Sequence, residues 1–110
     1  EKGSYLDKVL SLKNVNVTTV KLSAPNGGII ELLKFHSHKD KLKWDGKAYS
    51  TGLTHIALEV INVNLVYNNL IKSGVKFFDK PQNSPDGYAK LVFGQGPENV
   101  LIEFVEILSK

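Results

Sequence analysis

The 110-residue sequence contains no cysteine and no arginine, and each absence excludes a class of chemistry. Without cysteine the chain can form neither a disulfide nor a thiolate metal site. Without arginine it lacks the guanidinium forks that bind phosphates and guanine bases through paired hydrogen bonds, although its net charge is +3. The lysine-rich stretch 39–47 is then a solvated loop, and we expect no nucleic-acid partner.

Long hydrophobic runs are also missing. No apolar run approaches the roughly 18 residues of a membrane span, and the sequence does not open with a basic segment followed by an apolar one. We therefore expect a soluble, cytoplasmic protein that binds no membrane. Methionine is absent even at position 1, which predicts that the encoded protein starts upstream of Glu1. A hydrophobic fraction of 42% and a charged fraction of 23% are typical of one globular domain.

The first third of the sequence predicts a β-hairpin. Residues 15–23 alternate and are rich in β-branched side chains, and residues 29–35 form a second apolar run. Between them, Ala24-Pro-Asn-Gly-Gly28 supplies the residues of a tight turn. The polar, lysine-rich segment 37–51 that follows is typical of a linker.

The second half predicts one helix among strands. Residues 62–73 place apolar side chains at helical spacing, with Asn62 as the N-cap and Gly74 as the stop. Ile56, Leu58 and Val60 are expected to pack under this helix. The remaining pattern predicts strands at 53–60, 75–78, 89–93 and 100–108 and a loop at 81–87.

A repeat links the two halves. Residues 25–35, PNGGIIELLKF, align with residues 97–107, PENVLIEFVEI, at a constant offset of 72 residues. Proline falls on proline, isoleucine on isoleucine, and Glu31 on Glu103. Because side chains alternate faces along a strand, two copies of one unit would turn both glutamates into an apolar concavity.

A carboxylate on an apolar face needs a cation, a set of donors or a chemical role, because burying it unpaired is costly. A divalent metal would satisfy two converging carboxylates at once, and His55, which opens the strand THIALEV, is the candidate nitrogen ligand. Alternatively, Glu103 faces solvent at a sheet edge and His55 is a core histidine bonded to a backbone carbonyl. His36 and His38, two residues apart, are a further pair of possible ligands.

These residues resemble a known family. The segments GLTHIALEV, NNLIKSGVKFF and PDGYAKLVFGQGPENVLIEFVE, together with APNGGIIELLKF, are similar to the glyoxalase, bleomycin-resistance and ring-cleaving dioxygenase superfamily, also called vicinal oxygen chelate. The resemblance implies an α+β fold in which paired βαβββ modules form a cupped mixed sheet. Residues 1–36 would be a first module without its first strand and helix, residues 37–51 a linker, and residues 52–110 a complete second module.

The resemblance also implies a metal site with ligands from the first and last strands of each module. At the matching positions these are Glu31, His55 and Glu103, with a fourth ligand on the absent strand. Such oxygen and imidazole ligands suit zinc, nickel, cobalt, manganese or iron. The ion would act as a Lewis acid on a chelated enediolate or enolate, with Glu31 or Glu103 as the base. This predicts a lyase, or an isomerase or epimerase, acting on a small oxygenated metabolite.

Two alternatives stay open. A ring-cleaving dioxygenase would hold iron(II) with two histidines and one carboxylate, which leaves no place for a second glutamate such as Glu31. A non-catalytic protein of the bleomycin-resistance type would bind a drug or antibiotic, with its acids paired to lysines. In each case the partner is a small molecule, and an unpaired sheet edge favours a homodimer.

Overall fold

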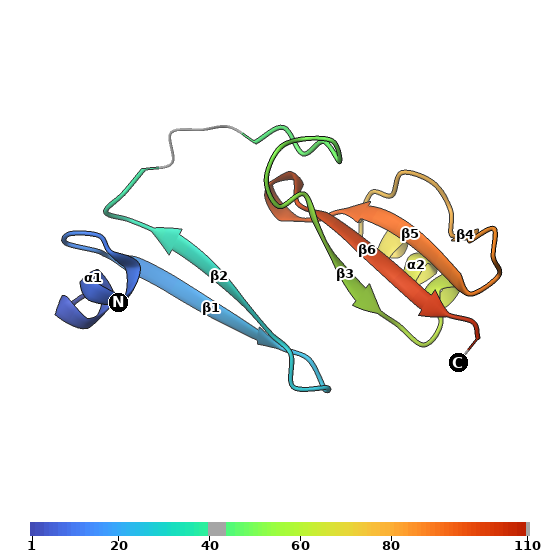
Figure 1. Cartoon of the computed structure of the whole chain (residues 1–110), viewed down its shortest axis with the longest axis horizontal. Coiled ribbons are helices and arrows are strands. Elements are labelled where there is room, and N and C mark those ends of the chain that lie inside the picture. The colour runs from blue at the N-terminus through green and yellow to red at the C-terminus, as the bar shows by residue number, and fades with distance from the viewer. Residues whose placement is uncertain (40–43, 110) are drawn as a thin grey trace. The chain divides into compact units, whose positions relative to one another are not determined.

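A computed structural model describes residues 1–39 and 44–109 and divides the chain into two compact units, Glu1–Lys43 and Trp44–Lys110 (Figure 1). The division falls within the predicted linker 37–51, of which residues 40–43 lie outside the described residues. Within the described ranges, the structure contains no helix with the length and apolar character that a membrane crossing requires.

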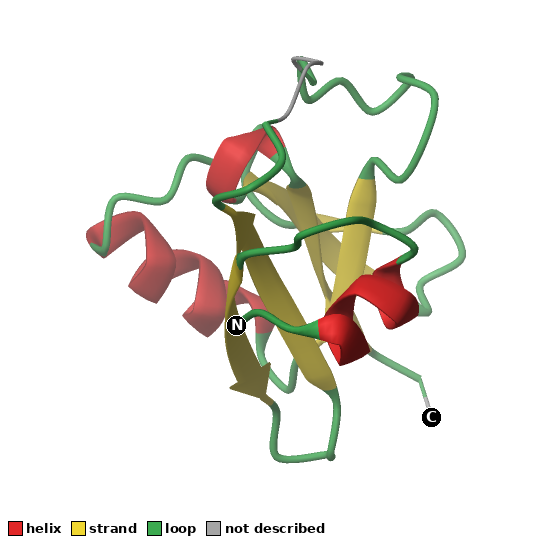
Figure 2. Cartoon of the chain, turned by 90° about the vertical axis from the view of Figure 1, so that its left-hand side faces the viewer, coloured by secondary structure: helices red, strands yellow, loops and turns green. Residues whose placement is uncertain are grey.

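The first unit is a short helix followed by a hairpin. Helix α1 (Ser4–Leu10) lies near the N-terminus (Figure 2), and β1 (Val17–Ser23) pairs with β2 (Ile29–Phe35) in antiparallel register. The predicted hairpin is therefore confirmed. Its turn requires a glycine, because Gly27 has a φ of 91° while its N–H donates to the carbonyl of Ala24 at 3.0 Å.

The second unit is a complete βαβββ module. Its elements are β3 (His55–Glu59), α2 (Val63–Lys72), β4 (Gln82–Asn83), β5 (Ala89–Gln95) and β6 (Leu101–Ile107). The sheet order is β3-β6-β5-β4, with β3 parallel to β6 and the other pairs antiparallel. The sheet is thus mixed, and the predicted α+β class is confirmed.

Helix α2 begins where it was predicted to begin. The Asn62 side chain accepts a hydrogen bond from the Leu65 N–H at 3.0 Å, which caps the first turn. The Glu106 carboxylate, from β6, accepts the Val63 N–H at 2.9 Å and places a negative charge at the positive end of the helix dipole. Val63 is fully buried, so the capped end is also the end that is anchored in the core.

One face of the sheet carries α2, which packs on β5 and β6 and lies behind the sheet in Figure 1. The prediction that the Ile56 and Leu58 side chains of β3 pack under this helix is wrong, since they are 41% and 38% exposed. The reason is the strand order: β3 lies at the edge of the sheet, beyond the two strands that the helix covers.

The predicted strand at 75–78 is also wrong. Phe77 forms a single bridge with Gly94, and the fourth strand of the sheet is β4, inside the segment predicted as a loop. The Phe77 ring lies 4.9 Å from the ring of Tyr67 and 6.2 Å from that of Phe104. Phe77 therefore packs between α2 and β6, whereas its neighbour Phe78 is 58% exposed, and the polar pair Gln82–Asn83 makes the edge of the ladder.

The turn between β4 and β5 is held by one carboxylate. Asp86 accepts hydrogen bonds from the Ser84 hydroxyl at 2.6 Å and from the Tyr88 N–H at 3.0 Å. These bonds, the one from Ser84 most, lower the pKa of Asp86 below its ordinary value. Their contribution is complete above the ordinary carboxyl pKa and is lost as the pH falls through the lowered one.

The sequence repeat is confirmed as a structural repeat. The hairpin β1–β2 and the hairpin β5–β6 have the same strand lengths, and every residue number differs by 72, from Val17 and Ala89 at one end to Phe35 and Ile107 at the other. The cross-strand register is the same in both hairpins. Glu31 and Glu103 therefore occupy the same position on the same face of equivalent strand pairs.

The turn between β5 and β6 contains strain that substitution can relieve. The Val100 N–H donates to the Pro97 carbonyl at 3.2 Å, and the central residues Glu98 and Asn99 have φ angles of 53° and 67°. This is a type I′ arrangement, which disfavours an ordinary side chain at the first central position and favours asparagine there.

We expect Glu98→Asn to raise the free energy of unfolding by about 0.5–1 kcal/mol, because asparagine tolerates the left-handed backbone that glutamate resists. Urea unfolding measures the change. Glu98→Gln is the matched control: it also removes the charge but should leave stability within about 0.3 kcal/mol of wild type, since surface changes are usually small. Equal stability of the two variants would contradict the explanation.

Candidate functional site

The face of the four-stranded sheet opposite α2, called here the open face, brings together residues from three strands. His55 of β3 pairs with Leu101 of β6 in the parallel register, so it lies diagonally across from Glu103, two residues further along β6. Phe93 of β5 lies directly opposite Glu103 in the antiparallel register. Directly opposed residues share a face, so His55, Glu103 and Phe93 are neighbours on the open face.

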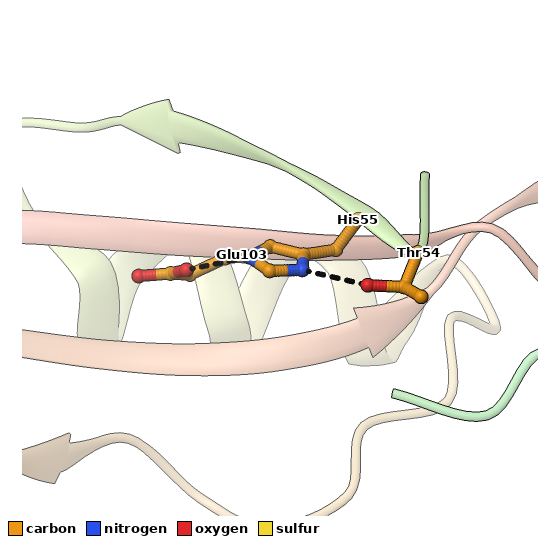
Figure 3. A network of polar contacts seen from close by, with 3 residues as sticks. All are labelled: Thr54, His55 and Glu103. Carbon is orange, nitrogen blue, oxygen red and sulfur yellow. Dashed lines mark hydrogen bonds and ion pairs between the residues drawn. The ribbon is translucent and has the colours of Figure 1, made fainter. Parts of the chain in front are cut away.

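Three contacts fix the imidazole of His55 (Figure 3). Its Nε2 lies 3.6 Å from Oε1 of Glu103, and its Nδ1 lies 3.2 Å from the Thr54 hydroxyl oxygen. The ring also packs edge to face against Phe93, with 5.1 Å between ring centroids and 63° between ring planes. The His55 side chain is 41% exposed and that of Glu103 is 19% exposed, so the pair is open to small molecules.

The 3.6 Å between His55 Nε2 and Glu103 Oε1 limits how the two side chains can interact. If the Nδ1–H donates to Thr54, the Nε2 lone pair faces a carboxylate oxygen, and two acceptors face each other unless a cation or a proton sits between them. If Nε2 carries the proton instead, 3.6 Å is longer than an ordinary hydrogen bond. The spacing is compatible with an ion pair to a protonated imidazole or with a metal cation between the two groups.

A divalent ion fits this spacing. Two ligands bonded to one zinc-like ion at about 2.0–2.2 Å, with tetrahedral or octahedral angles, lie about 2.8–3.6 Å apart, and the distance between His55 Nε2 and Glu103 Oε1 is 3.6 Å. The two residues supply half of a typical ligand set. Among the described residues, no cluster of three or more histidine and acidic side chains is close enough to hold an ion by itself.

The other predicted site residues lie in the first unit. Glu31 is on β2, directly opposite Lys21, and occupies the position equivalent to Glu103. The histidines predicted as a further ligand pair each have a polar partner: Nε2 of His36 lies 2.7 Å from the Thr18 hydroxyl, and Nδ1 of His38 lies 2.8 Å from the Ser37 hydroxyl. The structure therefore brings together His55 and Glu103 of the predicted ligands.

A cavity of about 260 Å³ lies beside Leu101 in the same unit. Leu101, the strand partner of His55, lines it together with Tyr49, Phe78 and Gln95. The loop that forms one wall depends on Gly46: a side-chain carbon there would lie 2.4 Å from Cβ of Asn99. Asp45, Lys47 and Asn99 add charged and polar groups to this lining, which does not include His55 or Glu103.

No protein-family model matches this sequence, and no curated protein matches it either. Solved protein structures do match this chain. A glyoxalase family protein from Bacillus cereus superposes with a TM-score of 0.85, at 20% identity, over 99% of this chain and 74% of that one. A glyoxylase/bleomycin resistance protein/dioxygenase domain from Frankia sp. EAN1pec gives a TM-score of 0.64, at 19% identity, over 83% of this chain and 69% of that one.

The chain has the glyoxalase/bleomycin resistance protein/dioxygenase fold. The resemblance inferred from the segments HIALEV and IEFVE is therefore confirmed for the architecture. At these identities the likeness is one of fold, and function has to be argued from the residues on the open face.

Sequence reasoning missed two residues of this face. The Thr54 hydroxyl contacts Nδ1 of the His55 ring, and the Phe93 ring packs edge to face against the same ring. Phe93 could have been found from the sequence, because the register of the predicted hairpin decides which residue lies directly opposite Glu103. Thr54 gave no signal, since a threonine before a strand is common for other reasons.

Proposed function

We propose that this protein is a metal-dependent lyase or isomerase that acts on a small oxygenated metabolite. The observation that carries the proposal is the facing arrangement of His55 Nε2 and Glu103 Oε1, 3.6 Å apart on the open face. The fold shared with glyoxalase family proteins supports it by analogy.

In this proposal each residue has a defined role. His55 and Glu103, the predicted ligands that the structure brings together, would hold a divalent ion. The bound ion would stabilise negative charge on the substrate's oxygens as a Lewis acid. Thr54 fixes the orientation of the imidazole through Nδ1, as a partner behind a metal-binding histidine commonly does. Glu103 would accept the proton from the carbon next to the carbonyl group.

The first test is a calorimetric titration of the wild-type protein with Zn²⁺ or Co²⁺. We expect saturable binding that His55→Ala weakens at least about 100-fold, because it removes the nitrogen ligand. His36→Ala/His38→Ala is the matched control and should bind as wild type does. The loaded protein should then exchange the carbon-bound protons of dihydroxyacetone in D₂O, as an enolising enzyme would.

The alternative is a non-catalytic binding protein, and the apolar walls that Tyr49, Phe78 and Leu101 give to the cavity favour it. The same titration separates the two functions. Binding of Zn²⁺ that does not depend on His55, together with no proton exchange, would contradict the enzymatic proposal and leave the binding protein.

A further inference from the structure

A cavity of about 230 Å³ lies on the helix side of the four-stranded sheet, at the C-terminal end of α2. Side chains alternate along β6, so Ile102 and Phe104, which line this cavity, point to the side away from Glu103. Leu70 of α2 and Val75, just beyond the helix, line it from the helix side. The cavity is therefore separate from the open face, to which the proposed function belongs.

The way in which α2 ends fixes the wall on the helix side. Gly74, with a φ of 93°, turns the chain back, and its N–H donates to the Ile71 carbonyl at 3.0 Å. The Val75 N–H donates to the Leu70 carbonyl, also at 3.0 Å. This is a Schellman motif, in which the residue after the glycine makes an apolar contact with the residue whose carbonyl it bonds. The Leu70 and Val75 side chains are thus held next to each other at the cavity.

Backbone hydrogen bonds also fix the wall on the sheet side. The Gln95 N–H donates to the Lys76 carbonyl at 2.9 Å, which ties the end of β5 to the segment after the helix. The Gly96 N–H donates to the Val100 carbonyl at 2.6 Å and closes the turn between β5 and β6. A side-chain carbon at Gly96 would lie 2.9 Å from Cδ1 of Ile102, so glycine lets this turn lie close to the sheet. Both walls are therefore in place without a ligand, as is usual for small-molecule sites.

We propose that this cavity is a binding site for a small, uncharged, apolar molecule the size of a substituted benzene ring. None of the described residues that line it is charged, so a charged ligand would lose its hydration without gaining a partner. Apolar cavities of about 150 Å³ lined by leucine, isoleucine and phenylalanine bind benzene. A cavity of about 230 Å³ has room for such a ring with a substituent.

The two ends of α2 differ in a way that supports the proposal. At the capped end Val63 is 0% exposed, so the helix is packed tightly on the sheet there. At the other end Leu70, Val75 and Phe104 are only half-buried, although all three belong to the apolar side of the module. An apolar ligand would remove these side chains from water, which is a favourable contribution to binding.

The experiment is a titration of the full chain with toluene, followed through the backbone amide signals in the ¹H–¹⁵N spectrum. We expect saturable shifts of the signals of Val75, Gly94 and Gly96, with a Kd on the order of 1 mM. Benzoate has the same ring with a carboxylate in place of the methyl group, and it should bind at least about tenfold more weakly. Shifts that do not saturate, or equal affinities for the two compounds, would overturn the inference.

Two identical substitutions on α2 test where toluene binds. Leu70→Phe adds volume inside the cavity and should weaken binding at least about tenfold. Leu65→Phe is the matched control: the Leu65 side chain is 57% exposed, and its Kd should stay within about twofold of wild type. Val75→Leu adds one methylene group to the same cavity and should weaken binding in the same direction, even if Leu70→Phe does not fold. Unchanged binding in Val75→Leu, or an equal loss in Leu65→Phe, would overturn the inference.

The proposal stands or falls separately from the metal-dependent function. His55→Ala removes a side chain of the open face and should bind toluene as wild type does, whatever its effect on Zn²⁺. Loss of toluene binding in His55→Ala would place the ligand on the open face and contradict a site under the helix.

Discussion

The Glu103→Gln variant will bind a divalent ion at least about 100-fold more weakly than the wild-type protein. The substitution keeps the size of the side chain but replaces an anionic ligand with a neutral amide, and it leaves His55 Nε2 facing a group that no longer attracts a cation. Calorimetric titration with Zn²⁺ or Co²⁺ measures the loss.

The fold of Glu103→Gln should be intact. The pair with His55 is partly exposed and 3.6 Å long, so it contributes less than about 1 kcal/mol to stability, which corresponds to a change of a few degrees in Tm. Glu98→Gln is the control for a lost carboxylate elsewhere in the same unit and should bind the ion normally. If Glu103→Gln bound the ion as tightly as wild type, the assignment of Glu103 as a ligand would be wrong.

Leu101→Ala will destabilise the second unit by about 3 kcal/mol, within the 2–5 kcal/mol that truncation of a buried leucine usually costs. Leu101 is 1% exposed and lies on β6 between its strand partners His55 of β3 and Gln95 of β5, so its side chain is buried within this part of the sheet. Urea unfolding gives the change in free energy, and Tm should fall by about 10 °C or more.

The control for Leu101→Ala is Leu53→Ala. Leu53 has the same side chain and precedes β3, but it is 97% exposed, so its truncation should cost less than about 0.5 kcal/mol. Equal destabilisation by the two substitutions would show that burial of Leu101 is not what stabilises the sheet around the candidate site.

The repeat made much of the fold predictable. Segments 25–35 and 97–107 differ in most of their residues, yet the shared proline, isoleucine and glutamate placed Glu31 and Glu103 at equivalent points, and the two hairpins have the same register. Turn residues and the alternation of apolar side chains are local signals, so they predict a hairpin without knowledge of its surroundings. The Asn62 cap was predictable for the same reason.

The errors have a common physical origin. A run of apolar residues reports burial, and burial does not distinguish a strand of the ladder from a segment that fills space under a helix. Phe77 packs against Tyr67 and Phe104, and the edge strand β4 formed from a polar pair instead. Similarly, the pattern of β3 predicts two faces, but only the sheet order decides that α2 covers β5 and β6.

The sequence by itself determined the hairpins, the capped helix, the duplicated unit and the face on which each candidate ligand lies, because these depend on neighbours within a few residues or on exact repetition. Only the tertiary structure decided that His55 meets Glu103. Their contact follows from the parallel pairing of β3 with β6, two strands separated in sequence by a helix and two further strands. Such a pairing is set by the packing of the whole module and has no local signal in either strand.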